Sequence, residues 1–282
     1  MEEIKLYSEK IYNGCEKVVM QCYVQKPSKE LTMPPRPVVL IFPGGGYSYT
    51  SDREAEPIAN AYLAAGYTAF VLRYSVGEHA VDSQPLLDAA LAIATIRSNA
   101  EKYHIDPDKI AVCGFSAGGH LAAFISTQWH SEIIKEKLNI ENIQAKPNAM
   151  ILCYPVISGI TSPNVHSFLN LTGQNSNEEN SIKYSIENHV DERTCPAFVW
   201  HTSDDTTVNV KNSMVLGQAL SDHNILFEMH IFPTGAHGLS ACTRETAANG
   251  NDIYISPYIG RWIGWSVKWL NNLFFKDNPF HD

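Results

Sequence analysis

Short apolar runs alternate with longer amphipathic stretches along most of the chain. Residues 38–42 are wholly apolar and end in a Pro-Gly-Gly-Gly segment, as expected of a strand that is buried on both faces. The pattern predicts further strands at 68–74, 110–113, 149–154, 197–200 and 226–232. Helices are predicted at about 54–65, 85–104, 119–129 and 259–275. This alternation predicts an α/β fold with a mostly parallel central sheet and helices on both faces.

One segment interrupts the alternation. Residues 158–190 lie between two predicted strands and are rich in Ser, Asn, Thr, Gln and Glu. A long insertion inside a compact domain is usually functional or mobile. We therefore expect residues 1–282 to form a single domain in which 158–190 is a small polar cap over the strand ends.

Composition narrows the classes of function. The formal net charge is −9, and the 21 basic residues are scattered, which argues against nucleic-acid or anionic-membrane binding. The start of the chain is charged and has no signal-peptide pattern, and no apolar run is long enough to cross a membrane. The six cysteines form no CxxC or metal-like spacing. These features predict a reduced, cytoplasmic setting and no metal site.

A candidate nucleophile lies in Gly114-Phe115-Ser116-Ala117-Gly118. Gly-x-Ser-x-Gly alone is weak, since roughly one chain in fifteen would contain it by chance. Here it follows an apolar strand and precedes a helix, as a nucleophile elbow requires. Side chains at Gly114 and Gly118 would collide with backbone in such a tight turn. The alternative is an ordinary strand–helix turn in which Ser116 caps the helix.

A serine nucleophile needs a general base and a carboxylate that orients it. Among eleven histidines, His237 follows the last predicted strand within small residues, so we interpret it as the base. His201 and His120 are more consistent with structural roles. Asp204 and Asp205 both follow the strand at 197–200, and their spacing alone does not separate them.

An acyl-transfer site also needs donors for an oxyanion. One expected donor is the N–H of Ala117, directly after the nucleophile. The second should come from Gly44-Gly45-Gly46, which follows the apolar strand at 38–42. The alternatives are a flexible turn or a phosphate loop, and the latter lacks the Lys-Ser/Thr pair that a phosphate loop needs.

Together these motifs resemble the acetyl-xylan-esterase-like and carbohydrate-esterase-like branch of the α/β hydrolases, over roughly residues 20–275. The motifs that carry the resemblance are Phe42-Pro43-Gly44-Gly45-Gly46-Tyr47, Arg53-Glu54-Ala55-Glu56-Pro57, Val71-Leu72-Arg73-Tyr74, Ile105-Asp106-Pro107-Asp108-Lys109-Ile110, the elbow continued through Gly119-His120, and Gly235-Ala236-His237-Gly238.

The resemblance implies an α/β-hydrolase fold. It also implies that Asp205 is the carboxylate, because the family typically places this residue three positions before a Val, as Asp205 stands before Val208. It also implies that Gly45 and Gly46 donate to the oxyanion. The chain departs from the family at Asn209, where Pro is usual, and at Pro43, where His is frequent. These departures bear on a helix start and on the hydrogen bonding of the glycine loop.

The polar cap and the resemblance predict a serine ester hydrolase that needs no cofactor and acts on small soluble esters, such as acetylated sugars. Tyr47, beside the glycine loop, is predicted to line the substrate pocket. An amide or peptide hydrolase, of arylformamidase or aminopeptidase type, would use the same residues. A thioesterase and a non-catalytic binding protein are further alternatives, but no basic patch serves a CoA phosphate and no member of the triad is missing.

Overall fold

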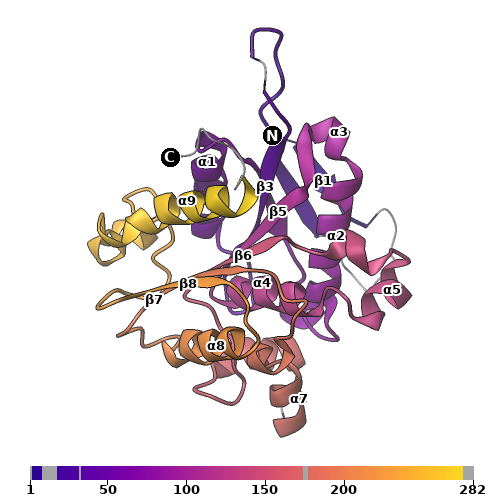
Figure 1. The fold of residues 1–282 in the computed structure, drawn as a ribbon. Coiled ribbons are helices and arrows are strands. Elements are labelled where there is room, and N and C mark those ends of the chain that lie inside the picture. Colours follow the sequence, from indigo (N-terminus) through magenta and orange to yellow (C-terminus); the bar gives the residue numbers. More distant parts are fainter. Residues whose placement is uncertain (1, 8–17, 32, 174–176, 276–282) are drawn as a thin grey trace.

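The computed structural model describes residues 2–7, 18–31, 33–173 and 177–275. In these ranges eight strands form one sheet in the order β1-β2-β4-β3-β5-β6-β7-β8 (Figure 1). The strands are β1 Glu2–Lys5, β2 Val19–Tyr23, β3 Arg36–Phe42, β4 Thr68–Arg73, β5 Ile105–Phe115, β6 Ala149–Cys153, β7 Ala197–Thr202 and β8 Phe227–Phe232.

The strands from β4 to β8 in this order are parallel to one another. β2 is antiparallel both to β4 and to the edge strand β1. The predicted mostly parallel sheet is thus confirmed, whereas β1 and β2 were not predicted. β1 carries only one apolar side chain and Gln21 interrupts the apolar residues of β2, so neither has the apolar run that marks the central strands. By contrast, Val38–Phe42 are completely buried in β3.

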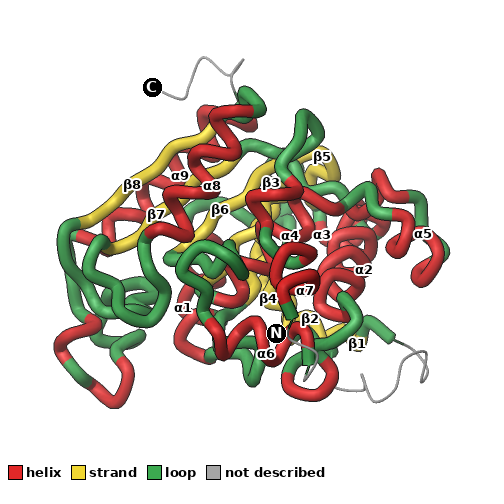
Figure 2. The backbone as a smooth tube through the Cα atoms, turned by 90° about the horizontal axis from the view of Figure 1, so that it is seen from below, coloured by secondary structure: helices red, strands yellow, loops and turns green. Residues whose placement is uncertain are grey.

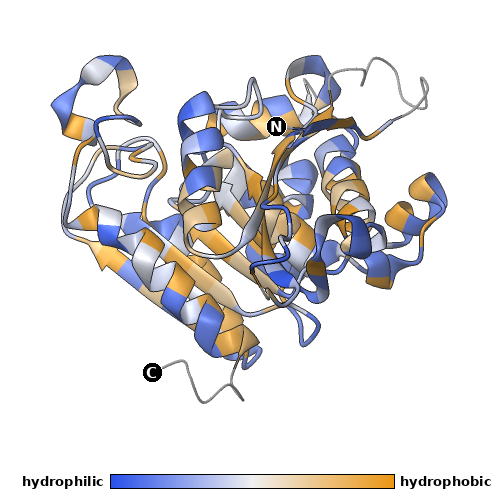
Figure 3. Ribbon diagram, turned by 90° about the horizontal axis from the view of Figure 1, so that it is seen from above, coloured by the Kyte–Doolittle hydropathy of each residue, from blue (hydrophilic) through white to orange (hydrophobic). Residues whose placement is uncertain are grey.

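Helices cover both faces of the sheet (Figures 1 and 2). One buried cluster packs the sheet against α2, α4 and α8, and a second packs it against α1 and α9. The strands between them are predominantly hydrophobic (Figure 3). The α-helices are α1 Glu56–Ala64, α2 Gln84–Ser98, α3 Ala100–Tyr103, α4 Ala117–Gln128, α5 Glu132–Leu138, α6 Val165–Thr172, α7 Glu178–Lys183, α8 Lys211–Asp222 and α9 Trp262–Phe274.

The predicted and observed bounds of helices and strands differ most in the segment before the elbow. The helix predicted to end near residue 104 breaks at Asn99 into α2 and α3, and His104 turns the chain with a φ of 51°. β5 then starts at Ile105, five residues earlier than predicted, although it contains Pro107. The pairing of β3 with β5 is irregular between Arg36 and Val38, and a proline is tolerated at such a bulge.

Residues 158–190 lie between β6 and β7 and contain α6 and α7. Phe168 and Leu171 of α6 are buried in the hydrophobic core, and other apolar side chains of this cap are exposed. Four of its apolar side chains are between 45% and 62% exposed, namely Ile160, Val165, Leu169 and Ile182. The cap therefore presents apolar as well as polar side chains to solvent.

The other composition-based expectations concern cysteine and the membrane. The five cysteines in the described ranges are buried and free, and Cys15 lies outside those ranges. Among the described residues, no helix combines the length and apolarity needed to cross a membrane.

Candidate active site

The nucleophile elbow joins β5 to α4 at Ser116. Its backbone has φ 53° and ψ −117°, a conformation that non-glycine residues rarely adopt. A Cβ at Gly114 would lie 2.1 Å from the carbonyl oxygen of Gly118, and one at Gly118 would lie 2.0 Å from that of Phe42. The chain therefore needs glycine on both sides of the serine, because each gap is already filled by backbone.

Backbone hydrogen bonds to β6, to the segment after it and within α4 hold this turn in place. The N–H of Ser116 donates to the carbonyl of Cys153 at 3.0 Å, at the end of β6. Its carbonyl accepts from Val156 at 3.0 Å and from His120 at 3.1 Å. These three bonds hold Ser116 in its strained conformation and present Oγ to the pocket.

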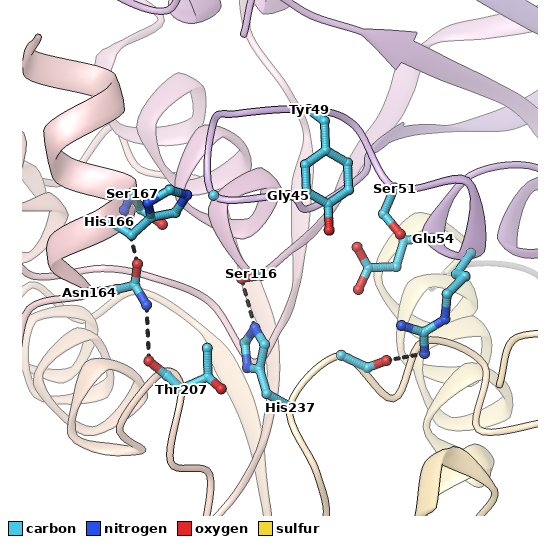
Figure 4. A pocket seen from close by; sticks show the side chains of 13 residues that line it. Gly45, Tyr49, Ser51, Glu54, Ser116, Asn164, His166, Ser167, Thr207 and His237 are labelled. Atoms are coloured by element: carbon cyan, nitrogen blue, oxygen red, sulfur yellow. Dashed lines mark hydrogen bonds between the residues drawn. The ribbon is translucent and has the colours of Figure 1, made fainter. Parts of the chain in front are cut away.

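His237 and Asp205 complete a connected array with Ser116, and Figure 4 shows the contact between Ser116 and His237. His237 Nε2 is 2.8 Å from Ser116 Oγ, and His237 Nδ1 is 2.7 Å from Asp205 Oδ2. In the arrangement that suits these contacts, Nδ1–H donates to the carboxylate and Nε2 accepts the serine proton. The ring of His237 also packs edge-on against Tyr154, with centroids 5.0 Å apart. The structure therefore brings together the three residues that the sequence proposed.

Asp205, rather than Asp204, contacts the histidine. Asp205 is buried, and its Oδ1 accepts from the N–H groups of Thr207 and Val208 at 2.9 Å each. Asp204 instead accepts from the N–H of Gly235 at 2.8 Å. Burial alone would raise the pKa of Asp205, but hydrogen bonds from His201 and His237 outweigh it and hold that pKa well below its usual range. The carboxylate is thus ionised throughout the neutral range.

The two remaining candidate histidines are buried and fully engaged, as expected of structural residues. His201 Nε2 donates to the Val208 carbonyl at 2.9 Å and lies 3.4 Å from Asp205 Oδ2. His120 lies between the carbonyl of Tyr184 and the hydroxyl of Tyr47, each at 2.8 Å. Burial lowers the pKa of His120 to about 4, so its imidazole is neutral near pH 7.

The glycine loop after β3 has its peptide planes fixed by internal bonds. The Gly44 carbonyl accepts from Ser51 at 2.9 Å, and the Gly45 carbonyl accepts from Ser48 at 2.9 Å. Because a trans peptide places its C=O and N–H on opposite sides, the N–H groups of Gly45 and Gly46 are directed away from these partners. The N–H of Ala117 opens α4 and has no acceptor within that helix. These are the three donors predicted for the oxyanion.

The cap contributes to the glycine loop, which the sequence did not predict. Asn170 Nδ2 donates to the Gly46 carbonyl and to Ser48 Oγ, both at 2.8 Å. His166 Nε2 lies 2.9 Å from the same hydroxyl, and its ring covers Gly46 so closely that a Cβ there would meet it at 2.8 Å. The face of α6 toward the loop therefore fixes the part of the chain that carries the expected donors.

The pocket above Ser116 has a volume of about 370 Å³. Asn164, His166 and Thr207 form one side of it, and Tyr49, Ser51 and Glu54 form the other (Figure 4). Most of these side chains can donate or accept hydrogen bonds, so the pocket suits a polar ligand.

The prediction that Tyr47 lines this pocket is not supported by its position. Tyr47 is only 1% exposed, and its ring lies in the core with its hydroxyl on His120. Tyr49, two residues later, is 61% exposed and lies at the pocket instead. Tyr47 has a φ of 60°, and this local reversal of the backbone turns its ring inward.

Two further residues line the pocket, Arg53 and Glu54, which belong to a motif of the family but were not predicted as site residues. Glu54 is buried, and Arg53 donates to the carbonyl of Gly238 at 2.6 Å. A charged pair at the start of a predicted helix is ordinarily exposed, so only the family motif could have drawn attention to it. Within the described residues, no group of three or more His, Cys, Asp or Glu side chains has the arrangement of a metal site.

Comparison with known proteins finds relatives that are similar to this chain over most of its length. The chain is 36% identical over 215 residues to endo-1,4-beta-xylanase B of Butyrivibrio fibrisolvens, which covers 74% of this chain and 33% of that protein. It is 31% identical over 202 residues to the acetylxylan esterase of Xylanibacter ruminicola, covering 70% of this chain and 39% of that protein. The chain thus spans between a third and two-fifths of the length of these two relatives.

A solved structure matches over almost the whole chain. The acetyl ester-xyloside bifunctional hydrolase of Caldicellulosiruptor lactoaceticus is 32% identical, with a TM-score of 0.82 over 96% of both chains. The carboxylesterase Cest-2923 of Lactobacillus plantarum is 29% identical, with a TM-score of 0.78 over 90% of this chain and 92% of that one. The sequence model of the family described as BD-FAE matches residues 23–220, and with the sheet and elbow described above we conclude that the chain belongs to the BD-FAE family of α/β hydrolases.

Proposed function

We propose that the protein is a serine carboxylic-ester hydrolase that removes short acyl groups, chiefly acetyl, from small soluble esters such as acetylated sugars. The observation that carries the proposal is the unbroken chain of contacts from Ser116 Oγ through His237 to the ionised Asp205. This array lies at the base of a polar pocket beside a preorganised glycine loop.

The reaction follows from the geometry. Ser116 Oγ attacks the ester carbonyl while His237 Nε2 takes its proton, and Asp205 stabilises the imidazolium that forms. The N–H groups of Gly45, Gly46 and Ala117 donate to the oxyanion of the tetrahedral intermediate. His237 then returns the proton to the leaving alcohol, which leaves the acyl group on Ser116. Water, activated by His237 in the same way, releases the acid and restores the serine.

Two features support a sugar as the alcohol part. Polar side chains line the pocket, and the exposed ring of Tyr49 at its edge offers an aromatic surface on which a sugar ring can stack. Related proteins carry the names acetylxylan esterase and acetyl ester-xyloside bifunctional hydrolase. We therefore expect Tyr49→Ala to raise KM severalfold for acetylated xylo-oligosaccharides and to change KM little for p-nitrophenyl acetate.

A substrate series tests the proposal. Purified protein and Ser116→Ala are assayed on aryl esters of increasing acyl length, acetylated xylo-oligosaccharides, a formyl-amide and a short peptide. We expect turnover to be highest for acetyl esters and to be lost in Ser116→Ala. A preference for acyl chains beyond about eight carbons would make the exposed apolar side chains of the cap part of a lipid-binding surface and would refute the short-ester proposal. Faster turnover of the amide or peptide would favour an amidase.

A further inference from the structure

A buried carboxylate lies beside the proposed nucleophile. Glu54 ends the short 3-10 helix at Asp52–Glu54 and is only 4% exposed, although its side chain reaches the active-site pocket (Figure 4). A Cβ built on Gly44 would lie 2.8 Å from Glu54 Oε2 and 3.1 Å from Ser116 Cβ. The carboxylate oxygen is therefore within about 6 Å of the serine side chain. The mechanism above gives it no role.

The first contact of Glu54 is with the oxyanion loop. Its Oε2 accepts from the N–H of Gly44 at 2.8 Å. Gly44 immediately precedes Gly45 and Gly46, the two glycines expected to donate to the oxyanion. With the Gly44 N–H held by Glu54 and the Gly44 carbonyl held by Ser51, both sides of this residue are fixed, and the next N–H has one direction.

The second contact leads to the loop that carries the histidine. Glu54 Oε1 accepts from the hydroxyl of Tyr154 at 2.6 Å. That hydroxyl accepts in turn from the N–H of Ser240 at 3.0 Å, and the Tyr154 ring packs against the imidazole of His237. A single carboxylate is therefore linked through short contacts to both loops that the reaction needs.

The neighbouring residue reinforces the second link. Arg53 donates to the carbonyls of Gly238 and Thr246 at 2.6 Å each, and its own carbonyl accepts from Ser240 Oγ at 2.5 Å. Ser240 and Gly238 belong to the histidine loop. Arg53 thus binds the histidine loop directly, while Glu54 joins that loop to the glycines through Tyr154.

We propose that Glu54 is a positioning residue that couples the oxyanion loop to the histidine loop by accepting from Gly44 and Tyr154 at once. The inference rests on the proposed function. Burying a carboxylate that has only neutral donors as partners costs free energy, so packing alone is a poor reason for this residue. Alignment of the two loops supplies a reason, because misplacing a catalytic group by about 1 Å can cost about 100-fold in rate.

Three variants separate the two contacts. Glu54→Ala removes both, and we expect kcat to fall about 100-fold while KM changes less than about threefold. Tyr154→Phe keeps the Glu54 acceptor for Gly44 but removes the hydroxyl that joins Glu54 to Ser240, so we expect about a tenfold loss. Glu54→Gln can still accept from Gly44 but meets Tyr154 with a donor, and we expect a loss close to that of Tyr154→Phe. Glu56→Gln, an exposed acid two residues later, is the matched control and should behave as wild type.

The closing experiment does not depend on the natural substrate. Diethyl p-nitrophenyl phosphate is added to each variant, and intact mass and p-nitrophenolate release give the second-order rate constant. The bond from Ser116 Oγ to phosphorus forms, the bond from phosphorus to the aryl oxygen breaks, and the serine proton passes to His237 while nitrophenolate leaves. Thermal unfolding, run in parallel, shows that each variant is folded.

We expect phosphorylation to slow in the order Glu54→Ala, then Glu54→Gln and Tyr154→Phe, with Glu56→Gln unchanged. If the folded Glu54 and Tyr154 variants react within twofold of wild type, the positioning role is wrong and the proposed function is unaffected. If wild type is phosphorylated at Ser116 and the variants are slowed, but no ester is hydrolysed, the positioning role stands and the proposed function fails. A wild-type Ser116 that does not react overturns both.

Discussion

Gly118→Ala perturbs the elbow at the point where it touches the oxyanion loop. The added Cβ would lie 2.0 Å from the carbonyl oxygen of Phe42 and 2.5 Å from that of Pro43, whereas ordinary contact begins at 3.4 Å. One backbone must therefore move by more than about 1 Å. Phe42 is fixed in the sheet by its pairing with Gly114 in β5, so the movement falls on Pro43 and the glycines after it, or on the start of α4.

Both stability and activity should change. Overpacking of this kind typically costs about 1–3 kcal/mol, and a rigid backbone neighbour places this site at the upper end. For a chain of this size each kcal/mol lowers Tm by about 2–4 °C, so we expect a fall of about 5–10 °C. A displacement of about 1 Å in the oxyanion loop should lower kcat by about 100-fold in the protein that remains folded.

The assay compares Gly118→Ala with Gly264→Ala by calorimetry and by turnover of p-nitrophenyl acetate. Gly264 lies inside α9, and a Cβ there would meet no atom within 4 Å. Alanine is the better helix former, so this control should keep wild-type activity and gain about 0.5–1 kcal/mol. If Gly118→Ala unfolds within about 1 °C of wild type and turns over within twofold of it, the close approach described here is wrong.

Three further changes test other parts of the site. Asp205→Asn should lower kcat by about 10²–10⁴-fold, because the imidazolium loses its ionised partner. Steady-state kinetics on a variant that circular dichroism shows to be folded measures this loss, and near-normal turnover would remove Asp205 from the array. The pKa of His120 is about 4 in the folded protein and 6.5 in the unfolded chain, so on acidification the unfolded chain binds the proton first. The free energy of unfolding therefore falls as the pH drops from about 6.5 to about 4, by up to about 3 kcal/mol. Urea unfolding of wild type and His120→Gln between pH 7 and 4 should show this fall only in wild type, and equal slopes would contradict it. Tyr47→Phe should leave KM unchanged and cost about 1–3 kcal/mol in urea unfolding, because it leaves His120 Nδ1 without its donor; a raised KM with unchanged stability would return Tyr47 to the pocket.

Elements buried on both faces could be predicted from the sequence. Val38–Phe42 and Ala197–Trp200 are apolar throughout, since every side chain of a central parallel strand meets a helix layer. The elbow at Ser116 and the position of His237 also follow from local patterns, whereas the choice of Asp205 over Asp204 came only from the family resemblance. β1 escaped prediction because an edge strand with one apolar side chain has no such pattern.

The remaining details of the site depend on contacts between distant segments. Tyr47 and Tyr49 are two residues apart in the same loop, and a backbone φ of 60° at Tyr47 decides which ring enters the core. Glu54 is buried because Gly44 and Tyr154 bring donors to it, the latter from 100 residues away. Pairings of this kind leave no periodic signal in a single sequence, so the lining of the pocket was less predictable than its reactive array.

The most direct test of the central proposal, that Ser116 carries the acyl group, is intact-mass analysis of the protein quenched during turnover of p-nitrophenyl acetate. Asp205→Asn can serve beside wild type to slow release of the acyl group, and peptide mapping locates the modification. The account predicts an added mass of one acetyl group on the peptide that contains Ser116, and none in Ser116→Ala. Acetyl found on another residue, or equal labelling of Ser116→Ala, would contradict it.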